Sequence, residues 1–561
     1  MLLTIYFIPK EIKPMGNSSK KLQKELKKSV PVKKTNDNEH TINVVMISVA
    51  VVVSVLIVAL AAFLIISGAK DKSAKPNELV SFKSDNYEVD NAMLSYFYTS
   101  NFYQFYQQNY QVLAYQYGFD ATKPLSQQVY DQSQGTSWHQ YFINMTANNM
   151  MQLIALAEDA KASGLKLDDE DIKKIEDSIT ELKTQADNVG KPLDEYLEYL
   201  HGEGVTESTV REALELTAMA SKQSEALVES FGTTTEECEE YYTENRTTFD
   251  KVSFRNHAIT ADAGEDLTEE QKQAAYDEAK AAAENIAAAT SEQDYVNKVY
   301  EYLLDRNALL DSPLSNDQVL TNAQDCLTKD YIYSAGNEID EWVFDPARKV
   351  GDSTVITTQD GAYNPILMVS LPARDETPTK TVRHILINTS NYDGIEAAEA
   401  KRDELQAAWD ASDKSLETFE KLADEYNEDS SSLYENITKG QMVEAFENWC
   451  FDESRKPGDC EMVTTEYGYH LVYFVEEGLP AWEYEAKNSI NSSKLEAKIN
   501  ELVEKYNVTF DTEKIARIKD YNAYQATPLD TTAAESVDTA IDTAADTTVD
   551  IAADTTVDTA A

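Results

Sequence analysis

The sequence predicts an α+β protein with a single transmembrane helix, an all-α module, two tandem α/β domains of which the first is degenerate, and a disordered acidic tail. Three observations predict this class. No charged residue occurs between Thr41 and Ala69. Apolar residues recur at helical spacing from Asn86 to Phe249, with few glycines or prolines. A block at residues 348–363 returns, altered, at residues 455–470.

The predicted boundaries follow these changes of pattern. We expect a basic cytoplasmic segment at 1–42, a transmembrane helix at 43–67, a helical module at 68–250, a degenerate α/β domain at 251–375, an intact copy of it at 379–477, a helical segment that completes the helical module at 478–520, and a disordered acidic tail at 521–561. In that tail aspartates recur every fourth residue among Thr, Ala and Val, where like charges would repel on a helix.

The apolar segment from Val44 to Ile66 is long enough to cross about 30 Å of hydrocarbon at about 1.5 Å per helical residue. The lysine-rich segment before it would stay in the cytoplasm, which would place the bulk of the chain outside a cell membrane crossed once. A cleavable signal peptide is the alternative, because Ser67, Gly68 and Ala69 offer small residues at a cleavage site.

The charge of the chain excludes one class of partner. With 99 Asp and Glu against 49 Lys and Arg, the net charge is -50, whereas a nucleic-acid-binding protein needs a basic face. Six histidines and four cysteines are few, and they show no paired zinc spacing. We therefore expect no metal, no cofactor and no nucleic-acid partner.

The helical module has recognisable helix starts and an unusual aromatic stretch. Two segments, 168–171 and 206–208, are predicted helix starts ahead of apolar-periodic runs. Residues 96–118, "YFYTSNFYQFYQQNYQVLAYQYG", are dense in Tyr and Phe. This stretch is interpreted either as the core of a helical hairpin or as an adaptable apolar cradle for unfolded chains, because aromatic rings offer large contact areas.

The two repeat copies share a skeleton and differ in their histidines. "RKVGDSTVITTQDGAY" ends at Tyr363, whereas "RKPGDCEMVTTEYGYH" ends at His470. Each copy begins with an apolar strand that carries one histidine, "VSFRNHAIT" around His257 and "TVRHILINT" around His384. These differences between the aligned copies indicate that only the second copy carries a functional site.

The second copy resembles the parvulin-type peptidyl-prolyl cis/trans isomerases. The resemblance rests on the ordered motifs "RHILI", "NEDSS", "GQMVEAFENWCF" and "TTEYGYHLVYFV" between residues 382 and 476. With the helical segments before and after it, the chain resembles the PrsA/SurA-like extracytoplasmic foldases. The two α/β domains are then expected to be parvulin-like, and the helical module to be a chaperone module.

The resemblance implies a set of site residues. It implies catalytic roles for His384, Asp429 and His470, and substrate-binding roles for Met442, Phe446 and Tyr467. Met442 and Phe446 would share one helix face and clamp a proline ring. Leu433 or Ile437 would supply the apolar wall, because the family's glycine-rich stretch is replaced here by "SSLYENITKG".

Each of these residues also has a structural interpretation. A histidine between apolar strand residues is often a satisfied core group, and Asp429 by itself reads as a cap or turn residue. Met442 and Phe446 by themselves read as core packing. Their joint occurrence in order favours the functional interpretation.

The first copy is expected to be inactive. Tyr363 replaces the closing histidine and Ile339 stands at the position of Phe446. We expect this copy to act as a spacer or as a second peptide-binding surface. Cys450 and Cys460, both absent from it, could form a disulfide or remain free buried thiols.

The predicted function is that of a membrane-anchored extracytoplasmic foldase. It would be a peptidyl-prolyl cis-trans isomerase that acts on X-Pro bonds of unfolded or partly folded secreted or envelope proteins, with holdase activity. A homodimer is a possible assembly. The alternative is a non-catalytic holdase or envelope scaffold with an inactive parvulin domain.

Overall fold

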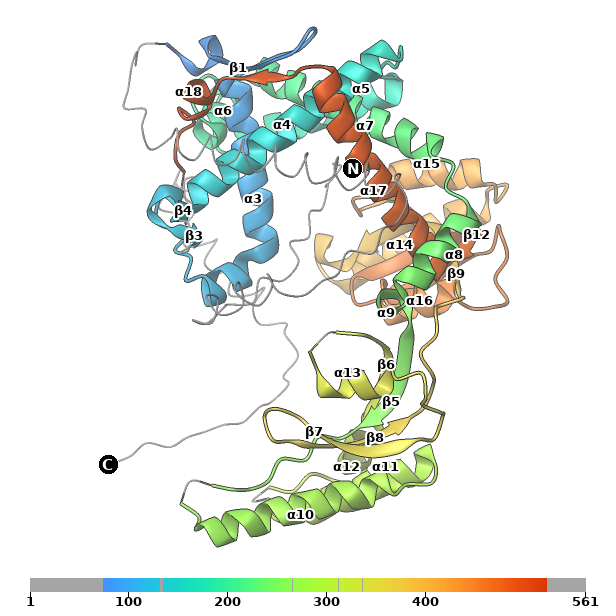
Figure 1. Cartoon of the computed structure of the whole chain (residues 1–561). Coiled ribbons are helices and arrows are strands. Elements are labelled where there is room, and N and C mark those ends of the chain that lie inside the picture. The colour runs from blue at the N-terminus through green and yellow to red at the C-terminus, as the bar shows by residue number, and fades with distance from the viewer. Residues whose placement is uncertain (1–73, 132–134, 265, 311, 335, 522–561) are drawn as a thin grey trace. The chain divides into compact units, whose positions relative to one another are not determined.

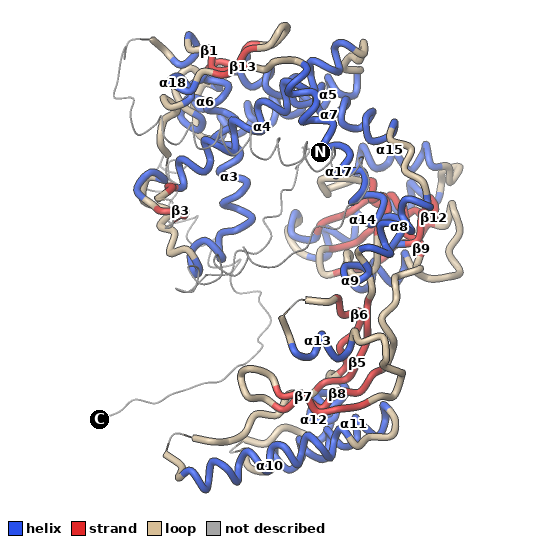
Figure 2. The backbone as a smooth tube through the Cα atoms, viewed as in Figure 1, coloured by secondary structure: helices blue, strands red, loops and turns tan. Residues whose placement is uncertain are grey.

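The computed structural model describes residues 74–131, 135–264, 266–310, 312–334 and 336–521 (Figure 1). The described residues divide into two compact units: the first combines those up to 232 with those from 493 onward, and the second comprises those of 233–492. Helices dominate the first unit, and strands are concentrated in the second (Figure 2). The predicted basic segment at 1–42, and the acidic tail from residue 522, lie outside the described residues.

The predicted fold class is wrong in its membrane-spanning element. Within the part of the chain that the structure describes, no helix combines the length and the apolar character needed to cross a membrane. The segment predicted to span the membrane, 43–67, lies outside the described residues. The mixture of helix and sheet that the α+β class requires is present.

The first unit is built mainly of helices. They are α3 (Asn91–Gln116), α4 (Trp138–Ala162), α5 (Asp169–Asn188), α6 (Leu193–His201), α7 (Glu207–Ser230) and the short α18 (Thr512–Ile515), with 3-10 turns η1 (Pro76–Glu78) and η2 (Leu125–Gln127). The predicted helix starts at 168–171 and 206–208 are confirmed, and the caps are Asp168 for α5 and Thr206 for α7, whose side chains accept hydrogen bonds from the first turn.

The all-α description of this module is wrong, because five short strands belong to it. They are β1 (Val80–Lys83), β2 (Glu88–Asp90), β3 (Val129–Asp131), β4 (Thr136–Ser137) and β13 (Thr509–Phe510). In one sheet β1 lies between β2 and β13, with Phe82 opposite Phe510. Strands of two to four residues are too short to leave a periodic signal in the sequence. The partner of β1 in β13 is also more than 400 positions away.

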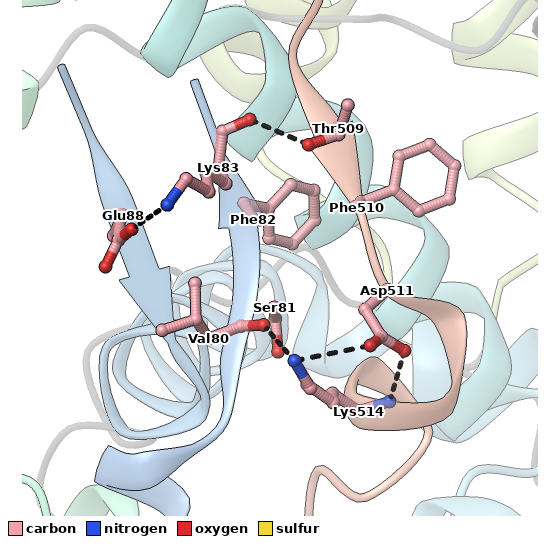
Figure 3. A pocket seen from close by; sticks show the side chains of 9 residues that line it. All are labelled: Val80, Ser81, Phe82, Lys83, Glu88, Thr509, Phe510, Asp511 and Lys514. Atoms are coloured by element: carbon pink, nitrogen blue, oxygen red, sulfur yellow. Dashed lines mark hydrogen bonds and ion pairs between the residues drawn. The ribbon is translucent and has the colours of Figure 1, made fainter. Parts of the chain in front are cut away.

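Figure 3 shows a pocket beside β1 and β13. Its volume is about 360 Å³. Its charged groups already have partners. The ammonium group of Lys514 donates to the carbonyl oxygen of Val80 at 2.9 Å and lies 3.3 Å from an Asp511 carboxylate oxygen. The hydrogen bond from Lys514 to Val80 joins the two ends of the described chain.

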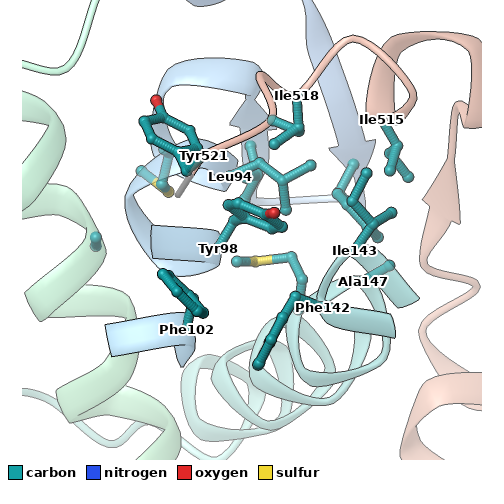
Figure 4. Packing of buried hydrophobic residues seen from close by; sticks show 14 of the residues in the cluster. Leu94, Tyr98, Phe102, Phe142, Ile143, Ala147, Ile515, Ile518 and Tyr521 are labelled. Atoms are coloured by element: carbon teal, nitrogen blue, oxygen red, sulfur yellow. The ribbon is translucent and has the colours of Figure 1, made fainter. Parts of the chain in front are cut away.

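The core of the first unit forms where α3 and α4 pack against the C-terminal residues. Tyr98 and Phe102 of α3 meet Phe142 of α4, while Ile515 and Tyr521 close the cluster (Figure 4). Around it lie partly buried rings, and Trp138 contacts Tyr130 with ring centroids 4.8 Å apart. Much of the aromatic stretch of α3 therefore belongs to a packed core.

The second unit begins with two helices and a four-stranded antiparallel sheet of order β6-β5-β8-β7. Its elements are α8 (Thr235–Glu244), α9 (Arg246–Phe249), β5 (Lys251–Asn256), α10 (Glu269–Ala287), α11 (Glu292–Asn307), α12 (Asn316–Gln324), β6 (Leu327–Ile332), α13 (Glu338–Val343), β7 (Ser353–Thr357) and β8 (Tyr363–Met368). One face of the sheet packs against α10 to α12 and the other against α13.

A second sheet of the same arrangement follows, in the order β10-β9-β12-β11. Its elements are β9 (Pro378–Asn388), η3 (Thr389–Asn391), α14 (Ile395–Asp410), α15 (Leu416–Tyr426), β10 (Leu433–Ile437), α16 (Glu444–Cys450), β11 (Cys460–Thr465) and β12 (Gly468–Pro480). Residues of α14 and α15 cover one face, and residues of α16 cover the other.

Helix α17 (Ala481–Lys505) contributes residues to both units. Trp482 and Ala486 near its start pack with Cys238 and Phe249 of the second unit. Ile499 and Leu502 near its end belong to a cluster with α4 and α7 of the first unit. Its apolar positions therefore serve two separate cores.

Gly468 provides a test of the central strand pairing. It has a φ of 144°, and an added Cβ would lie 2.1 Å from the backbone oxygen of Ile387. We predict that Gly468→Ala lowers the free energy of unfolding by about 3 kcal/mol, since backbone atoms must move apart. Urea denaturation followed by tryptophan fluorescence measures the loss.

Gly361 is the matched control, because it occupies the corresponding hairpin of the first copy. It also has a positive φ, 84°, but a Cβ there would meet no atom within 4 Å. Gly361→Ala should cost only about 1 kcal/mol of left-handed strain. Equal losses in the two variants would contradict the predicted backbone clash.

Candidate functional site

The pairing of β9 with β12 brings His384 and His470 together. His384 lies opposite Val472, and His470 lies opposite Leu386, so the two side chains are diagonal neighbours on one face of the sheet. Their rings stack at an interplanar angle of 17°, with the two Nδ1 atoms 3.3 Å apart. Both side chains are buried.

The hydrogen-bond partners assign a tautomer to each ring. The Nε2 atom of His384 lies 3.0 Å from the carbonyl oxygen of Ser431, which can only accept, so this nitrogen carries a proton. A neutral His384 then accepts at Nδ1, and His470 donates from its own Nδ1. The Nε2 atom of His470 is left as an acceptor for the hydroxyl of Thr465, 2.8 Å away.

Burial keeps this pair neutral. It lowers the pKa of His384, although Asp429 and the Ser431 carbonyl act in the opposite direction. Burial, together with repulsion from His384, lowers the pKa of His470 to about 4. At neutral pH the site therefore presents uncharged imidazoles joined in one directed chain of hydrogen bonds.

Asp429 lies beside this pair, in the turn after α15. One carboxylate oxygen accepts from the Tyr434 hydroxyl at 2.7 Å and lies 3.4 Å from Nε2 of His384. Burial alone would raise the pKa of Asp429. Hydrogen bonds from Tyr434 and Ser430, and the nearby His384, outweigh burial and lower the pKa.

Aromatic rings enclose the histidines. Phe446 meets His384 and His470 edge-on, with centroid distances of 5.7 and 5.5 Å. The ring of Tyr434 stacks on His384 at 4.6 Å and 23°. The site therefore combines two neutral polar rings with two aromatic ones.

Sequence reasoning missed Tyr434. It expected the apolar wall at Leu433 or Ile437. Leu433 pairs with Arg383 and faces away from His384, whereas Tyr434 pairs with Val382 and lies on the face of His384. Ile437 is buried in the core below. Strand alternation would have identified Tyr434 had the register been known.

Met442 approaches the site differently from the prediction. Helix α16 begins at Glu444, so Met442 precedes the helix and does not share a helical face with Phe446. The carboxylate of Glu447 accepts from the backbone N–H of Gly440 at 2.6 Å and holds the chain in a turn there. Met442 still packs, partly buried, against the cluster that contains Phe446.

Tyr467 lies at the tip of the β11–β12 turn and is 55% exposed. Its backbone carbonyl accepts from the N–H of Thr389. In the described part of the chain its side chain makes no ring contact with the histidines. The structure thus brings together five of the six predicted residues and leaves Tyr467 at the rim.

The two cysteines are free thiols. Cys450 is buried in the cluster beneath α16, whereas Cys460 packs with the cluster on the other face of the sheet. Burial raises the pKa of each thiol to about 12. A disulfide between Cys450 and Cys460 is not formed, because the sheet separates their side chains.

The first copy carries asparagines where the second carries histidines. The strand pairing aligns the two copies, because Arg255 lies opposite Leu367 in the first copy as Arg383 lies opposite Tyr473 in the second. Each of these arginines also forms an ion pair with a carboxylate on a helix. The next residue along the strand is Asn256, opposite Ile366. It therefore takes the place of His384, and His257 lies one position further on.

The hairpin of the first copy is displaced in the same way. Thr357 pairs with Tyr363, leaving a longer loop than the turn between Thr465 and Gly468. As a result Tyr363 packs with the α10 to α12 cluster, on the opposite face, and Asn364 takes the place of His470. The Asn364 side-chain amide donates to the hydroxyl of Thr358 at 3.1 Å. This hydrogen bond corresponds to the one between Thr465 and His470 in the second copy.

A comparison with known protein families decides the class of the second sheet. Residues 368–477 match the family described as the PPIC-type PPIASE domain. This segment, the PPIase domain, is similar to that family. The predicted resemblance to parvulin-type isomerases is confirmed for it.

The chain also matches solved structures. The crystal structure of PrsA from Bacillus subtilis has 16% sequence identity, a TM-score of 0.20, and coverage of 68% of this chain and 90% of that one. PrsA from Bacillus cereus has 14% identity, a TM-score of 0.16, and coverage of 56% and 93%. TM-scores this low carry no argument about fold or function. No curated protein sequence matches the chain significantly.

The neutral histidine pair of the PPIase domain predicts a pH dependence of stability. Because the pKa of His470 is about 4 in the folded state and 6.5 ordinarily, the unfolded chain binds the proton more readily. The stability contributed by neutral His470 is complete above pH 6.5 and declines as the pH falls toward 4.

His470→Asn, which introduces the residue found at the corresponding position of the first copy, removes this titration. The difference in free energy of unfolding between the parent and the variant should shrink as the pH falls from 7 to 4 in urea denaturation. A difference that does not change with pH would contradict a neutral, buried His470.

Proposed function

We propose that the PPIase domain catalyses cis/trans isomerisation of X-Pro peptide bonds, with His384, His470 and Asp429 at the reacting amide. The observation that carries the proposal is the neutral, buried histidine pair enclosed by Phe446 and Tyr434. The match of residues 368–477 to the PPIC-type family supports it.

The proposed chemistry requires no proton or covalent transfer. Rotation about an X-Pro bond is opposed by amide resonance, which sets a barrier of about 18 to 20 kcal/mol. A site lowers this barrier when it binds the twisted, less resonant amide better than the planar one. Apolar rings hold the proline, and the imidazoles offer hydrogen bonds without the desolvation cost of a charge.

We propose unfolded or partly folded proteins as substrates, because an X-Pro bond enters such a pocket only from an accessible chain. The prediction that these clients are secreted or envelope proteins rests on the sequence before residue 74 and on the resemblance to extracytoplasmic foldases. It stays a prediction, as does the homodimer.

Phe446→Ala tests the proposed pocket. We expect kcat/KM for a proline peptide to fall roughly tenfold to hundredfold, because up to about 3 kcal/mol of apolar contact with the proline ring is lost. A protease-coupled isomerisation assay on the full chain measures the change. Ile339→Ala is the matched control, since Ile339 is the buried helix residue at the same place in the first copy.

An unchanged kcat/KM in Phe446→Ala would contradict the proposed pocket. A comparable loss in Ile339→Ala would indicate that activity depends on general stability or on the first copy. Absence of any activity in the parent chain would remove the enzymatic proposal and leave a binding protein.

We also propose a holdase function for the first unit. Tyr117 and Val129 are each 51% exposed, beside partly buried rings that pack on Trp138. Exposed apolar residues that continue an aromatic cluster offer contacts to apolar segments of an unfolded chain.

A double variant, Tyr117→Ser with Val129→Ser, tests this function. We expect suppression of client aggregation, followed by light scattering, to be roughly halved as this apolar surface is lost. Leu309→Ser with Leu310→Ser removes similarly exposed residues from the second unit and should have no effect. Equal losses in both variants would argue against a specific surface on the first unit.

A further inference from the structure

Tyr434 makes contacts to both polar components of the PPIase site. Its hydroxyl donates to Asp429 at 2.7 Å, and its ring stacks on His384 at 4.6 Å. It also meets Phe446 edge-on at 6.3 Å. Burial raises the pKa of this phenol, and the hydrogen bond to Asp429 raises it further, so the hydroxyl stays a donor.

The Tyr434 hydroxyl restricts the Asp429 carboxylate. The other carboxylate oxygen accepts from the backbone N–H of Ser430, the adjacent residue. The oxygen that faces His384 has the Tyr434 hydroxyl as its close partner and lies 3.4 Å from the imidazole Nε2. Without the hydroxyl this oxygen would lose its strongest contact within the site, and the side chain could turn toward solvent.

The Tyr434 ring acts on a different component. His384 and Tyr434 come from adjacent strands, and their planes differ by only 23°. On its other side His384 stacks with His470 at 17°. His384 is therefore held between two nearly parallel rings, which fixes the direction in which its nitrogens point.

We propose that Tyr434 is a positioning residue of the PPIase domain, whose hydroxyl holds the Asp429 carboxylate against His384 and whose ring fixes the plane of that imidazole. This inference rests on the proposed isomerase function. Tyr434 acts through Asp429 and His384, so its hydroxyl influences the turnover of bound peptide more than the binding of peptide.

The first copy contains a tyrosine–aspartate pair that serves as a control for Tyr434 and Asp429. There the hydroxyl of Tyr331 donates to the buried Asp340, also at 2.7 Å, on a sheet that carries asparagines in place of the histidines. Tyr331→Phe therefore removes a tyrosine–aspartate hydrogen bond of the same length, away from the proposed site.

The experiment compares the parent, Tyr434→Phe, Asp429→Ala and the double variant, all as full-length chains. Tyr434→Phe keeps the ring and removes the hydroxyl. We expect kcat to fall roughly tenfold, as for the loss of one hydrogen bond to a charged group, while KM stays within about twofold. In the Asp429→Ala background the same substitution should cause no further loss.

Tyr434→Leu separates the contribution of the ring. It keeps an apolar side chain but ends the stacking on His384, so kcat should fall below that of Tyr434→Phe. Tyr331→Phe should leave kcat and KM unchanged. Urea denaturation of each variant establishes that it is folded under the assay conditions.

Several outcomes would overturn the inference. One is an equal loss on Tyr434→Phe in the parent and in the Asp429→Ala background. Others are a change confined to KM, or a loss in Tyr331→Phe as large as in Tyr434→Phe. An inactive parent chain would instead refute the proposed function, so the two failures are distinguishable.

Discussion

The antiparallel pairing of β9 with β12 determines the geometry of the PPIase domain. It sets His384 and His470 as diagonal neighbours on one face, and on the other face it places Ile385 and Leu471 in the core beneath α14 and α15. Because side chains alternate along a strand, one register choice decides both the site and the core. The close approach of Gly468 to Ile387 shows how little space this pairing leaves.

The same pairing explains how a strongly acidic chain maintains an uncharged histidine pair. The net charge of the chain is -50, yet the hydrogen-bond partners of the two imidazoles are neutral. They are the other imidazole, the hydroxyl of Thr465 and the carbonyl oxygen of Ser431, and the carboxylate of Asp429 lies at the edge. Protonation of His384 would place two N–H donors opposite each other at Nδ1. Burial and the direction of the Nδ1 hydrogen bond therefore both oppose protonation of His384. Both effects come from contacts within the fold.

Local signals in the sequence were sufficient for some features and insufficient for others. The caps at Asp168 and Thr206, and the motifs around His384, Asp429 and Phe446, depend on neighbouring residues and could be predicted. The role of Tyr434, the helix start after Met442 and the strand β13 depend on register or on distant partners. Aligned by identity, the repeats match Tyr363 with His470, yet the strand pairing matches Asn364 with it. Sequence identity between the repeats cannot reveal this one-residue displacement. The displacement occurs in the hairpin turn, and identical residues of the shared motif lie on both sides of that turn.

The longer hairpin loop of the first copy limits how mutation could convert the first copy into the second. Replacing Tyr363 with histidine would put an imidazole into the α10 to α12 core, on the wrong side of the sheet. Restoring a histidine pair would require substitutions at Asn256 and Asn364, and the loop would still differ in length. Divergence by a change in loop length is harder to reverse than divergence by substitution, because a point mutation cannot undo it. The two copies can therefore accumulate separate roles without exchanging them.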